Sequence, residues 1–190
     1  RSGAGLVSVI TRSAHRPAFL GRFPEIMMFG TEDEDAPVDE LLARASVIVI
    51  GPGLGRSEWS RTLLQLALSK QVSAGIPLVV DADGLNLLSE RSDSKVVIKR
   101  DNWILTPHAG EAARLLGSTV ADVQADRFAA VTELYNRWGG CCLLKGSGSL
   151  IAAPNEELFL CTEGNAGMAS GGMGDVLSGV IAGLVAQKLT

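Results

Sequence analysis

Short apolar runs alternate along this chain with longer stretches in which apolar residues recur every three or four positions. The short runs predict β-strands, and most are almost continuously apolar, which is typical of parallel strands covered on both faces. The predicted strands are residues 6–11, 46–50, 77–80, 103–105 and 141–145. Two further runs, residues 149–153 and 157–161, lie on either side of Pro154 and Asn155 and predict a small β-hairpin.

The periodic stretches predict helices, at residues 38–45, 58–74, 110–116, 122–138 and 175–187. Strands and helices that alternate in this way predict a three-layer α/β domain, in which helices flank a central, mostly parallel sheet. In the last helix the apolar period predicts one buried face, made of Val176, Leu177, Val180, Ile181 and Leu184.

The composition indicates one globular domain. The 190 residues are 46% hydrophobic and 5% aromatic, so the chain can bury a single, largely aliphatic core. A net charge of −4 without a long basic run argues against nucleic acid or an anionic membrane surface as the partner. The three cysteines show no metal-ligand spacing and indicate buried thiols in a reducing compartment. Because no apolar run reaches about 20 residues, we expect a cytoplasmic protein.

Residue 1 is arginine, and the helical pattern of the last predicted helix continues to the end of the sequence. We therefore expect residues 1–190 to form one domain of a fragment that lacks N- and C-terminal segments. Activity of such a fragment on its own does not follow from its family.

Residues 164–187 read GNAGMASGGMGDVLSGVIAGLVAQ, so a glycine-dense loop leads into a long apolar helix. Gly171, Gly172 and Gly174 let backbone N–H groups approach an anion closely, and the helix adds the positive end of its dipole. Asp175 then stands beside the bound anion. A carboxylate here could be a simple helix cap worth about 1 kcal/mol, but a cap does not explain the three glycines. The loop is not a Walker A sequence, because no Gly-Lys-Ser/Thr follows.

Polar and glycine-rich stretches follow four of the predicted strands, at residues 51–55, 81–86, 106–111 and 145–149. In open α/β sheets, ligands bind at the carboxyl ends of the strands. We therefore expect these four stretches and the glycine-dense loop to face one crevice.

Each of the four stretches also has a purely structural explanation. Residues 51–55, GPGLG, fit an ordinary tight turn and lack the spacing of a dinucleotide fingerprint. Asp83 fits a helix cap, with Asp81 bonded to backbone. His108 and Glu111 fit the first turn of a helix, and they also suit substrate hydrogen bonding and a water-mediated Mg²⁺ contact. Lys145 fits a surface lysine, although the Gly-Ser-Gly-Ser that follows favours a nucleotide.

Four motifs in this order resemble those of the ADP/ATP-dependent NAD(P)H-hydrate dehydratases, a family of the ribokinase-like superfamily. They are VVDADGLNLL at 79–88, ILTPHAGEAARLLG at 104–117, LLKGSGSLIA at 143–152 and the glycine-dense segment at 164–187. The resemblance covers nearly the whole chain, and it implies a ribokinase-like fold.

The resemblance also implies a repair reaction. The substrate would be the (S)-epimer of hydrated NADH or NADPH (NADHX or NADPHX), whose ring hydroxyl is phosphorylated by ADP, or by ATP in some lineages. Phosphate then leaves and NAD(P)H is restored, with AMP as the second product when ADP is used. Mg²⁺ would assist, and family members are commonly homo-oligomers, sometimes fused to an epimerase domain.

Residue roles follow from the same resemblance. Asp175 would be the general base that takes the proton from the ring hydroxyl. The residues expected to contact the hydrated dinucleotide are Gly53, Gly55, His108, Glu111 and Asp175. The residues expected to bind the nucleotide are Lys145, Gly146, Ser147, Gly148, Ser149, Asn165, Gly171, Gly172 and Gly174. Glu111 would also contact Mg²⁺ through water.

The glycine-dense loop departs from the family pattern at two positions, of which Ser170 keeps a hydroxyl group. Family members usually read ATGGTGD, whereas this chain reads ASGGMGD at 169–175, so Met173 replaces a hydroxyl-bearing residue. Two other functions stay open. A ribokinase-like kinase of a small vitamin-type alcohol would need the same loop and Asp175, and its product would retain phosphate. A non-catalytic nucleotide-binding module would bind ADP without turnover.

Overall fold

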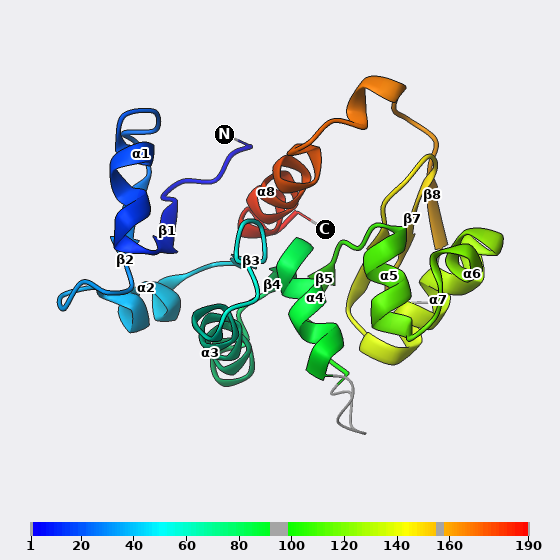
Figure 1. Ribbon diagram of the computed structural model, residues 1–190, viewed down its shortest axis with the longest axis horizontal. Helices are drawn as coiled ribbons and strands as arrows, with labels where there is room; N and C mark the ends of the chain where they lie inside the picture. Colours follow the sequence, from blue (N-terminus) through cyan, green and yellow to red (C-terminus); the bar gives the residue numbers. More distant parts are fainter. Residues whose placement is uncertain (1, 92–98, 155–157, 190) are drawn as a thin grey trace.

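The computed structural model describes residues 2–91, 99–154 and 158–189, and its central feature is a six-stranded sheet (Figure 1). Its strands run in the order β3, β4, β5, β6, β7 and β8. The first four are parallel and match predicted strands: β3 Ile48–Ile50, β4 Leu78–Val80, β5 Trp103–Leu105 and β6 Cys141–Leu144. The prediction of a mostly parallel sheet is therefore confirmed.

The last two strands, β7 (Ser149–Ala152) and β8 (Leu158–Cys161), are antiparallel and form the predicted hairpin. Residue 157, where the second strand of the hairpin was expected to begin, and Asn155 of the expected turn lie outside the described residues. The hairpin places β8 at one edge of the sheet.

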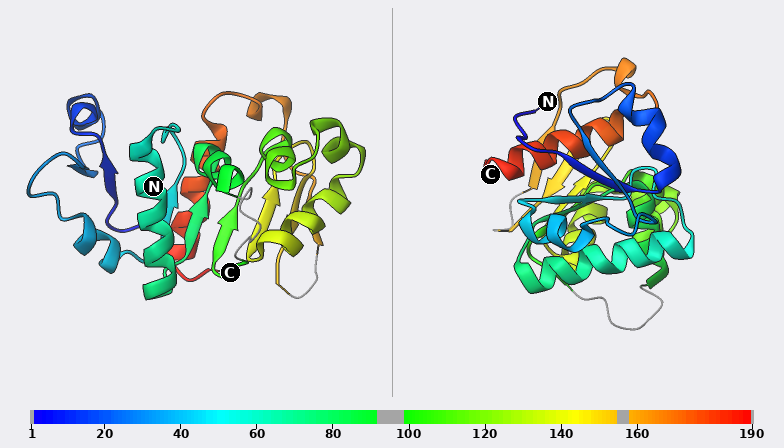
Figure 2. Two further views of the ribbon diagram at one scale, coloured as in Figure 1. Left: turned by 60° about the horizontal axis from the view of Figure 1, so that its bottom comes forward. Right: turned by 90° about the vertical axis from the view of Figure 1, so that its left-hand side faces the viewer.

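Helices cover both faces of the sheet, as the three-layer prediction requires (Figure 2). One face carries α3 (Glu58–Ala74), α4 (Ala82–Arg91), α5 (Ala109–Leu116) and α7 (Arg127–Trp138), and the other carries α8 (Met173–Ala186). The main core lies under the first group, where Trp103 packs against Trp138 at a ring distance of 5.9 Å. Strand side chains buried in this core include Leu78, Leu105, Cys142, Leu144 and Leu150.

A smaller parallel pair, β1 (Ser8–Thr11) and β2 (Met27–Gly30), forms its own two-stranded sheet. It carries η1 (Ser13–His15) and α1 (Arg16–Leu20), and α2 (Val38–Arg44) leads from it into β3 (Figure 1). The strand predicted at residues 6–11 is thus shorter than expected. Its partner β2 was not predicted, because a run of four residues directly after a proline-containing turn gives too little periodic signal.

The α8 helix buries a different face from the one that its apolar period predicts. Its buried residues are Ser178, Ala182 and Gly183, whereas Val176 is 60% exposed and Leu184 is 41% exposed. Small side chains let the helix lie close to β3 and β4. The helix is apolar on nearly every side, so periodicity alone could not identify the face that packs against the sheet.

Two other expectations about helices need correction. The helix predicted at 122–138 is two helices, α6 (Val120–Ala125) and α7, because Asp126 is extended and its carboxylate accepts a hydrogen bond from the N–H of Ala129 at 2.8 Å. Asp83, which was expected to fit a helix cap, is instead the second residue of α4 (Ala82–Arg91). Within the described part of the chain, none of the helices is long and apolar enough to cross a membrane.

Candidate active site

Two of the polar strand ends meet in an ion pair at the carboxyl edge of the sheet. Asp81 follows β4 and Lys145 follows β6, and the Lys145 Nζ atom lies 2.7 Å from Oδ1 of Asp81. The side chain of Asp81 is 1% exposed and that of Lys145 is 19% exposed. Lys145 is therefore not the surface lysine that its sequence context allowed, and the main partners of Asp81 are side chains rather than backbone.

The electrostatics of Asp81 favour its charged form. Burial alone raises the pKa of its carboxyl group. Hydrogen bonds from Lys145 and Ser178, together with the charge of Lys145, outweigh burial and hold this pKa below its usual range. The pair is therefore a buried carboxylate and ammonium at neutral pH.

The first turn of α8 packs onto this ion pair. The Ser178 hydroxyl lies 2.7 Å from Oδ2 of Asp81 and 3.1 Å from the carbonyl oxygen of Gly174. A Cβ atom added to Gly174 would lie 3.3 Å from Lys145 Nζ and 3.7 Å from Asp81 Oδ2. The start of α8 therefore lies against two of the polar strand ends, at Asp81 and Lys145.

The glycine-dense loop ends at Gly172, which is the N-cap of α8 and has a φ of +87°. An N-cap glycine offers no side-chain acceptor to the N–H groups of the first helical turn. Asp175 is the third residue of the helix and is exposed, so it is not the helix cap. Space is open around the Cα atoms of Gly171 and Gly172, where an added Cβ would meet no atom within 4 Å.

His108 and Glu111 form a capping box at the start of α5, as their structural explanation proposed. The His108 Nδ1 atom accepts from the N–H of Gly110 at 2.9 Å, and Oε2 of Glu111 accepts from the N–H of His108 at 2.8 Å. Glu111 is 5% exposed and Lys145 Nζ lies 3.9 Å from its Oε2. Burial raises the pKa of Glu111, although the His108 N–H and the Lys145 charge oppose that rise.

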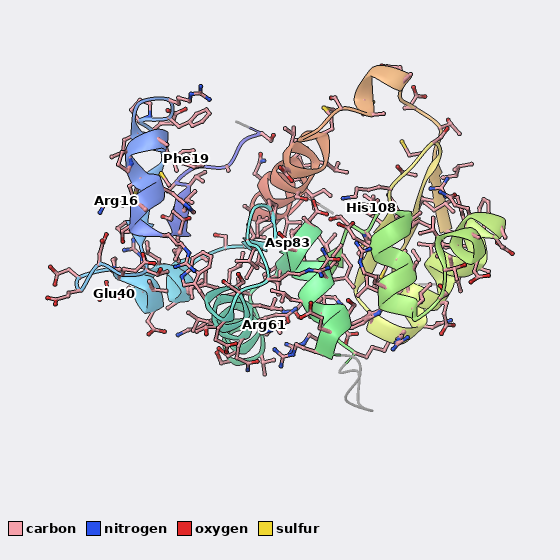
Figure 3. The ribbon with its side chains drawn as sticks, viewed as in Figure 1. Arg16, Phe19, Glu40, Arg61, Asp83 and His108 are labelled. Carbon is pink, nitrogen blue, oxygen red and sulfur yellow. The ribbon has the colours of Figure 1, made fainter. Side chains whose placement is uncertain are left out.

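The imidazole of His108 remains half exposed, so the capping role leaves one side of the ring open to solvent. In Figure 3 its label lies at the start of α5, next to the start of α4 that carries Asp83. Asp83 Oδ2 accepts a hydrogen bond from the N–H of Gly55 at 2.9 Å. The loop after β3 is thereby fastened to α4.

The glycines after β3 serve different purposes. Gly51 has a φ of +127°, and a side chain there would collide with the carbonyl oxygen of Asp81, so tight geometry explains this glycine. Gly53 has a φ of +63° and is exposed, with no atom within 4 Å of an added Cβ. Space above Gly53 is therefore open to a ligand.

An arginine from α7 contacts the loop after β6, which consists of Gly146, Ser147 and Gly148, and Ser149 begins β7. The guanidinium of Arg127 donates to the carbonyl oxygens of Ser147 at 2.5 Å and Leu144 at 3.2 Å. Its Nη2 atom would lie 2.8 Å from a Cβ at Gly146, which has a φ of +154°. Any side chain at Gly146 would therefore disturb both the arginine and the loop.

The segment between β8 and α8, which contains Asn165, arches over the outside of the molecule (Figures 1 and 2). Its side chain accepts a hydrogen bond from the N–H of Gly167 at 2.9 Å and caps the short helix η2 (Ala166–Met168). The residue is exposed in this arrangement.

Sequence reasoning assigned no site role to Asp81, Ser178 or Arg127. Asp81 was interpreted as bonded to backbone, and the signal that could have distinguished it is its place directly after an entirely apolar strand. A serine inside an otherwise apolar helix could have indicated a buried partner for Ser178. Nothing in the local pattern around Arg127 indicates that it reaches the loop after β6.

Acidic side chains do not gather into a ready-made metal site here. In the ranges that the structure describes, no group of three or more His, Cys, Asp or Glu side chains could hold a metal ion. Mg²⁺, however, usually retains several waters and uses one or two carboxylates together with substrate phosphates. A single carboxylate such as Glu111 would therefore suffice for a Mg²⁺ ion that is held mainly by substrate phosphates.

Comparison with solved structures identifies the fold of this protein. A ribokinase-like superfamily protein from Enterococcus faecalis superposes with a TM-score of 0.85 at 32% identity, over 98% of this chain and 63% of that one. An ADP/ATP-dependent NAD(P)H-hydrate dehydratase from Bacillus subtilis, co-crystallised with ATP/Mg²⁺, superposes with a TM-score of 0.76 at 29% identity, over 97% and 63% of the two chains. The protein is thus an α/β protein with the ribokinase-like fold, as expected.

The family follows from the sequence comparisons. The profile of the NAD(P)H-hydrate dehydratase family matches residues 1–190, and the chain belongs to this family. A bifunctional NAD(P)H-hydrate repair enzyme of Coxiella burnetii is 48% identical over all of this chain and 37% of its own length. An ADP-dependent (S)-NAD(P)H-hydrate dehydratase of Neisseria meningitidis is 43% identical over 90% of this chain and 55% of its own. The chain thus spans little more than a third of the bifunctional relative.

Proposed function

We propose that this chain supplies the dehydratase site that restores NAD(P)H from (S)-NAD(P)H-hydrate at the expense of ADP. The observation that carries the proposal is the meeting of the Asp81–Lys145 ion pair with the first turn of α8, immediately before Asp175. A positive side chain, an N-terminal helix turn without a side-chain cap and an exposed carboxylate are what transfer of a phosphoryl group to a hydroxyl needs.

In the first step, Asp175 accepts the proton of the ring hydroxyl as that oxygen attacks the terminal phosphorus of ADP. A P–O bond to the ring forms, and the P–O bond to AMP breaks. In the second step, the C–O bond to phosphate breaks as a proton leaves the neighbouring ring carbon. The electron pair of that C–H bond becomes the ring double bond, and the products are NAD(P)H, phosphate and AMP.

The loops around Asp175 would bind the two substrates. Charge on the transferred group would be stabilised by Lys145 and by the backbone N–H groups of Gly171, Gly172 and Gly174. The other groups proposed to hold the nucleotide are Gly146, Ser147, Gly148, Ser149 and Asn165. The hydrated dinucleotide would lie over Gly53, Gly55, His108 and Glu111, since Gly53 is open and the His108 ring is half exposed.

Mg²⁺ would be held by the nucleotide phosphates and by Glu111 through water. When bound, it would neutralise charge on the phosphate oxygens. The Glu111 carboxylate already accepts the N–H of His108, so its position is fixed before any cation arrives.

A longer polypeptide is part of this proposal, since the bifunctional relatives extend well beyond the matched region. We propose that the intact protein carries an epimerase domain and forms homo-oligomers. We also propose that it acts in the cytoplasm. Cys141, Cys142 and Cys161 are free thiols, which suits a reducing compartment, although only Cys142 is buried and Cys161 is exposed rather than buried as expected.

Phosphorus NMR of the reaction products tests the proposed chemistry. With ADP, Mg²⁺ and (S)-NADH-hydrate, we expect AMP and inorganic phosphate to appear in equal amounts. Accumulation of a phosphate ester of the substrate would instead identify a kinase. Binding of ADP without any new phosphorus signal would identify a non-catalytic module.

A further inference from the structure

Asp81 and Ser178 form a buried contact between segments that lie 97 positions apart in the sequence. Asp81 is 1% exposed and Ser178 is 0% exposed. The two carboxylate oxygens have different partners, since Oδ1 binds the Lys145 ammonium and Oδ2 binds the Ser178 hydroxyl, each at 2.7 Å. One carboxylate therefore connects the end of β6 to α8.

Burial of this contact costs more free energy than a role in packing alone would explain. A buried carboxylate must lose its hydration, and replacing buried ionic groups with apolar ones often leaves a protein equally stable. Ser178 has a single hydroxyl proton, and the charged carboxylate at 2.7 Å attracts it more strongly than the Gly174 carbonyl at 3.1 Å. The Ser178 hydroxyl thus donates its proton to Asp81 rather than to the Gly174 carbonyl oxygen of its own helix.

The backbone around Asp81 is also held in place. Ala82, the next residue, has a φ of +46°, a left-handed conformation that residues with a side chain seldom adopt. Gly51 of the neighbouring strand end packs directly on the Asp81 carbonyl oxygen. The carboxylate therefore points from a fixed position toward Lys145 and α8.

Gly174 and Ser178 are four residues apart and lie on one line along α8. This line of small residues lets the ammonium of Lys145 lie against the first helical turn, 3.3 Å from where a Gly174 side chain would begin. The next residue in the chain is Asp175. The position of the Lys145 ammonium relative to Asp175 thus depends on the two contacts of Asp81, one with Lys145 and one with Ser178.

We propose that Asp81 and Ser178 are positioning residues, which fix the Lys145 ammonium and the first turn of α8 relative to each other for phosphoryl transfer. Neither residue touches the reacting atoms in this account. The inference rests on the proposed function, because it concerns the rate of that reaction. Displacement of the Lys145 ammonium should lower kcat more than it weakens nucleotide binding. An ammonium released from its carboxylate still attracts phosphate.

The test compares Asp81→Asn, Ser178→Ala and the double variant with the wild-type protein. Thr132→Ala is the matched control, because Thr132 lies at an exposed position of α7 and its hydroxyl donates to the carbonyl oxygen one helical turn earlier, that of Phe128, at 2.8 Å. We measure kcat and KM with (S)-NADH-hydrate, the Kd of ADP by calorimetry, and hydrogen–deuterium exchange of the first turn of α8.

We expect Asp81→Asn to lower kcat by about 100-fold and Ser178→Ala by about 10-fold, while the Kd of ADP stays within about 3-fold of wild type. The double variant should be no slower than Asp81→Asn alone, because Ser178 acts through that carboxylate. Exchange in the first turn of α8 should rise in all three variants and stay unchanged in Thr132→Ala. Losses of kcat that multiply in the double variant, or a Kd that rises in step with the fall in kcat, would overturn the positioning role.

The exchange measurement separates this inference from the proposed function. If the wild-type protein lacks dehydratase turnover, the proposed function is refuted. Faster exchange in the first turn of α8 in the Asp81 and Ser178 variants would then still establish the positioning, and unchanged exchange would refute it.

Discussion

Asp175 differs from most charged residues at this end of the sheet, because it is exposed at the start of α8 and does not cap the helix. Asp81, Lys145 and Glu111 are held in buried contacts instead. This division suits a site in which buried charges set the geometry and the exposed carboxylate handles the proton.

Substitution of Asp175 by asparagine tests the general-base role. Asp175→Asn removes the proton acceptor but changes neither shape nor packing, so we expect turnover to fall by at least about 100-fold. Thermal unfolding and the Kd of ADP should stay near wild type. Turnover close to the wild-type rate would remove Asp175 from the mechanism.

Gly172 tests the role of the glycine-dense loop in phosphate binding. Gly172→Ala places a methyl group in the open space over the helix N-terminus, so we expect weaker ADP binding in calorimetry. Its φ of +87° also predicts a loss of about 1 to 2 kcal/mol in unfolding free energy. Gly75→Ala is the control, since Gly75 has a φ of +64° at the end of α3, far along the chain from the loop. Equal ADP affinity in both variants would contradict a phosphate site at Gly172.

The ionisation of Asp81 makes a pH prediction. Its pKa in the folded protein is below the ordinary value of 3.8, so its contribution to stability is present above pH 3.8 and is lost as the pH falls through the lowered folded value. In urea unfolding, the difference in stability between wild type and Asp81→Asn should therefore be largest near neutral pH and shrink below pH 3.8. If the difference in stability between wild type and Asp81→Asn grew as the pH fell, the pKa of Asp81 would be raised in the folded protein rather than lowered.

Single residues of the site were predictable from the sequence only where they stand in a motif. Glycines after a strand and before a helix have few explanations, so Gly172 and Gly174 could be recognised as parts of a loop at a helix N-terminus, and their role in anion binding stays a prediction. Ser178 and Arg127 could not, because their partners Asp81 and Ser147 come from remote parts of the chain. The role of Lys145 could not be decided from the sequence, since its burial depends on the carboxylate of Asp81, which lies 64 positions away in the chain.

At the level of elements, the sequence indicated the four parallel strands and the helix α3 closely, because each is a long or strongly apolar segment. The buried face of α8 was predicted wrongly. Apolar side chains surround this helix, and its packing was decided by small residues and by the hydroxyl of Ser178. A helix that lies close to a sheet needs small side chains at the contact, and hydrophobic periodicity carries no information about side-chain size.

The corrected packing of α8 predicts unequal costs for two leucine truncations. Leu134 of α7 is 0% exposed, so Leu134→Ala should destabilise the protein by about 2 to 5 kcal/mol. Leu184 of α8 is 41% exposed, so Leu184→Ala should cost less than about 1 kcal/mol. Urea unfolding of both variants measures the two values, and equal large losses would mean that Leu184 is buried after all.

At the scale of the whole molecule, one sheet edge gathers segments from β4, β5, β6 and the start of α8. The parallel order of the strands makes this possible, since their carboxyl ends lie on the same side. The chain belongs to the NAD(P)H-hydrate dehydratase family over its whole length while spanning about a third of its bifunctional relatives. The contacts among Asp81, Lys145, Glu111 and Ser178 all lie within these residues.

Absorbance at 340 nm tests the central proposal most directly. Purified protein is mixed with Mg²⁺ and (S)-NADH-hydrate, and ADP is then added, with reactions lacking ADP or containing ATP run beside it. We expect the NADH band to return only after nucleotide is added, with a yield equal to the hydrate supplied. A band that stays absent with either nucleotide, while calorimetry shows that ADP binds, would contradict the proposal that this chain carries a complete dehydratase site.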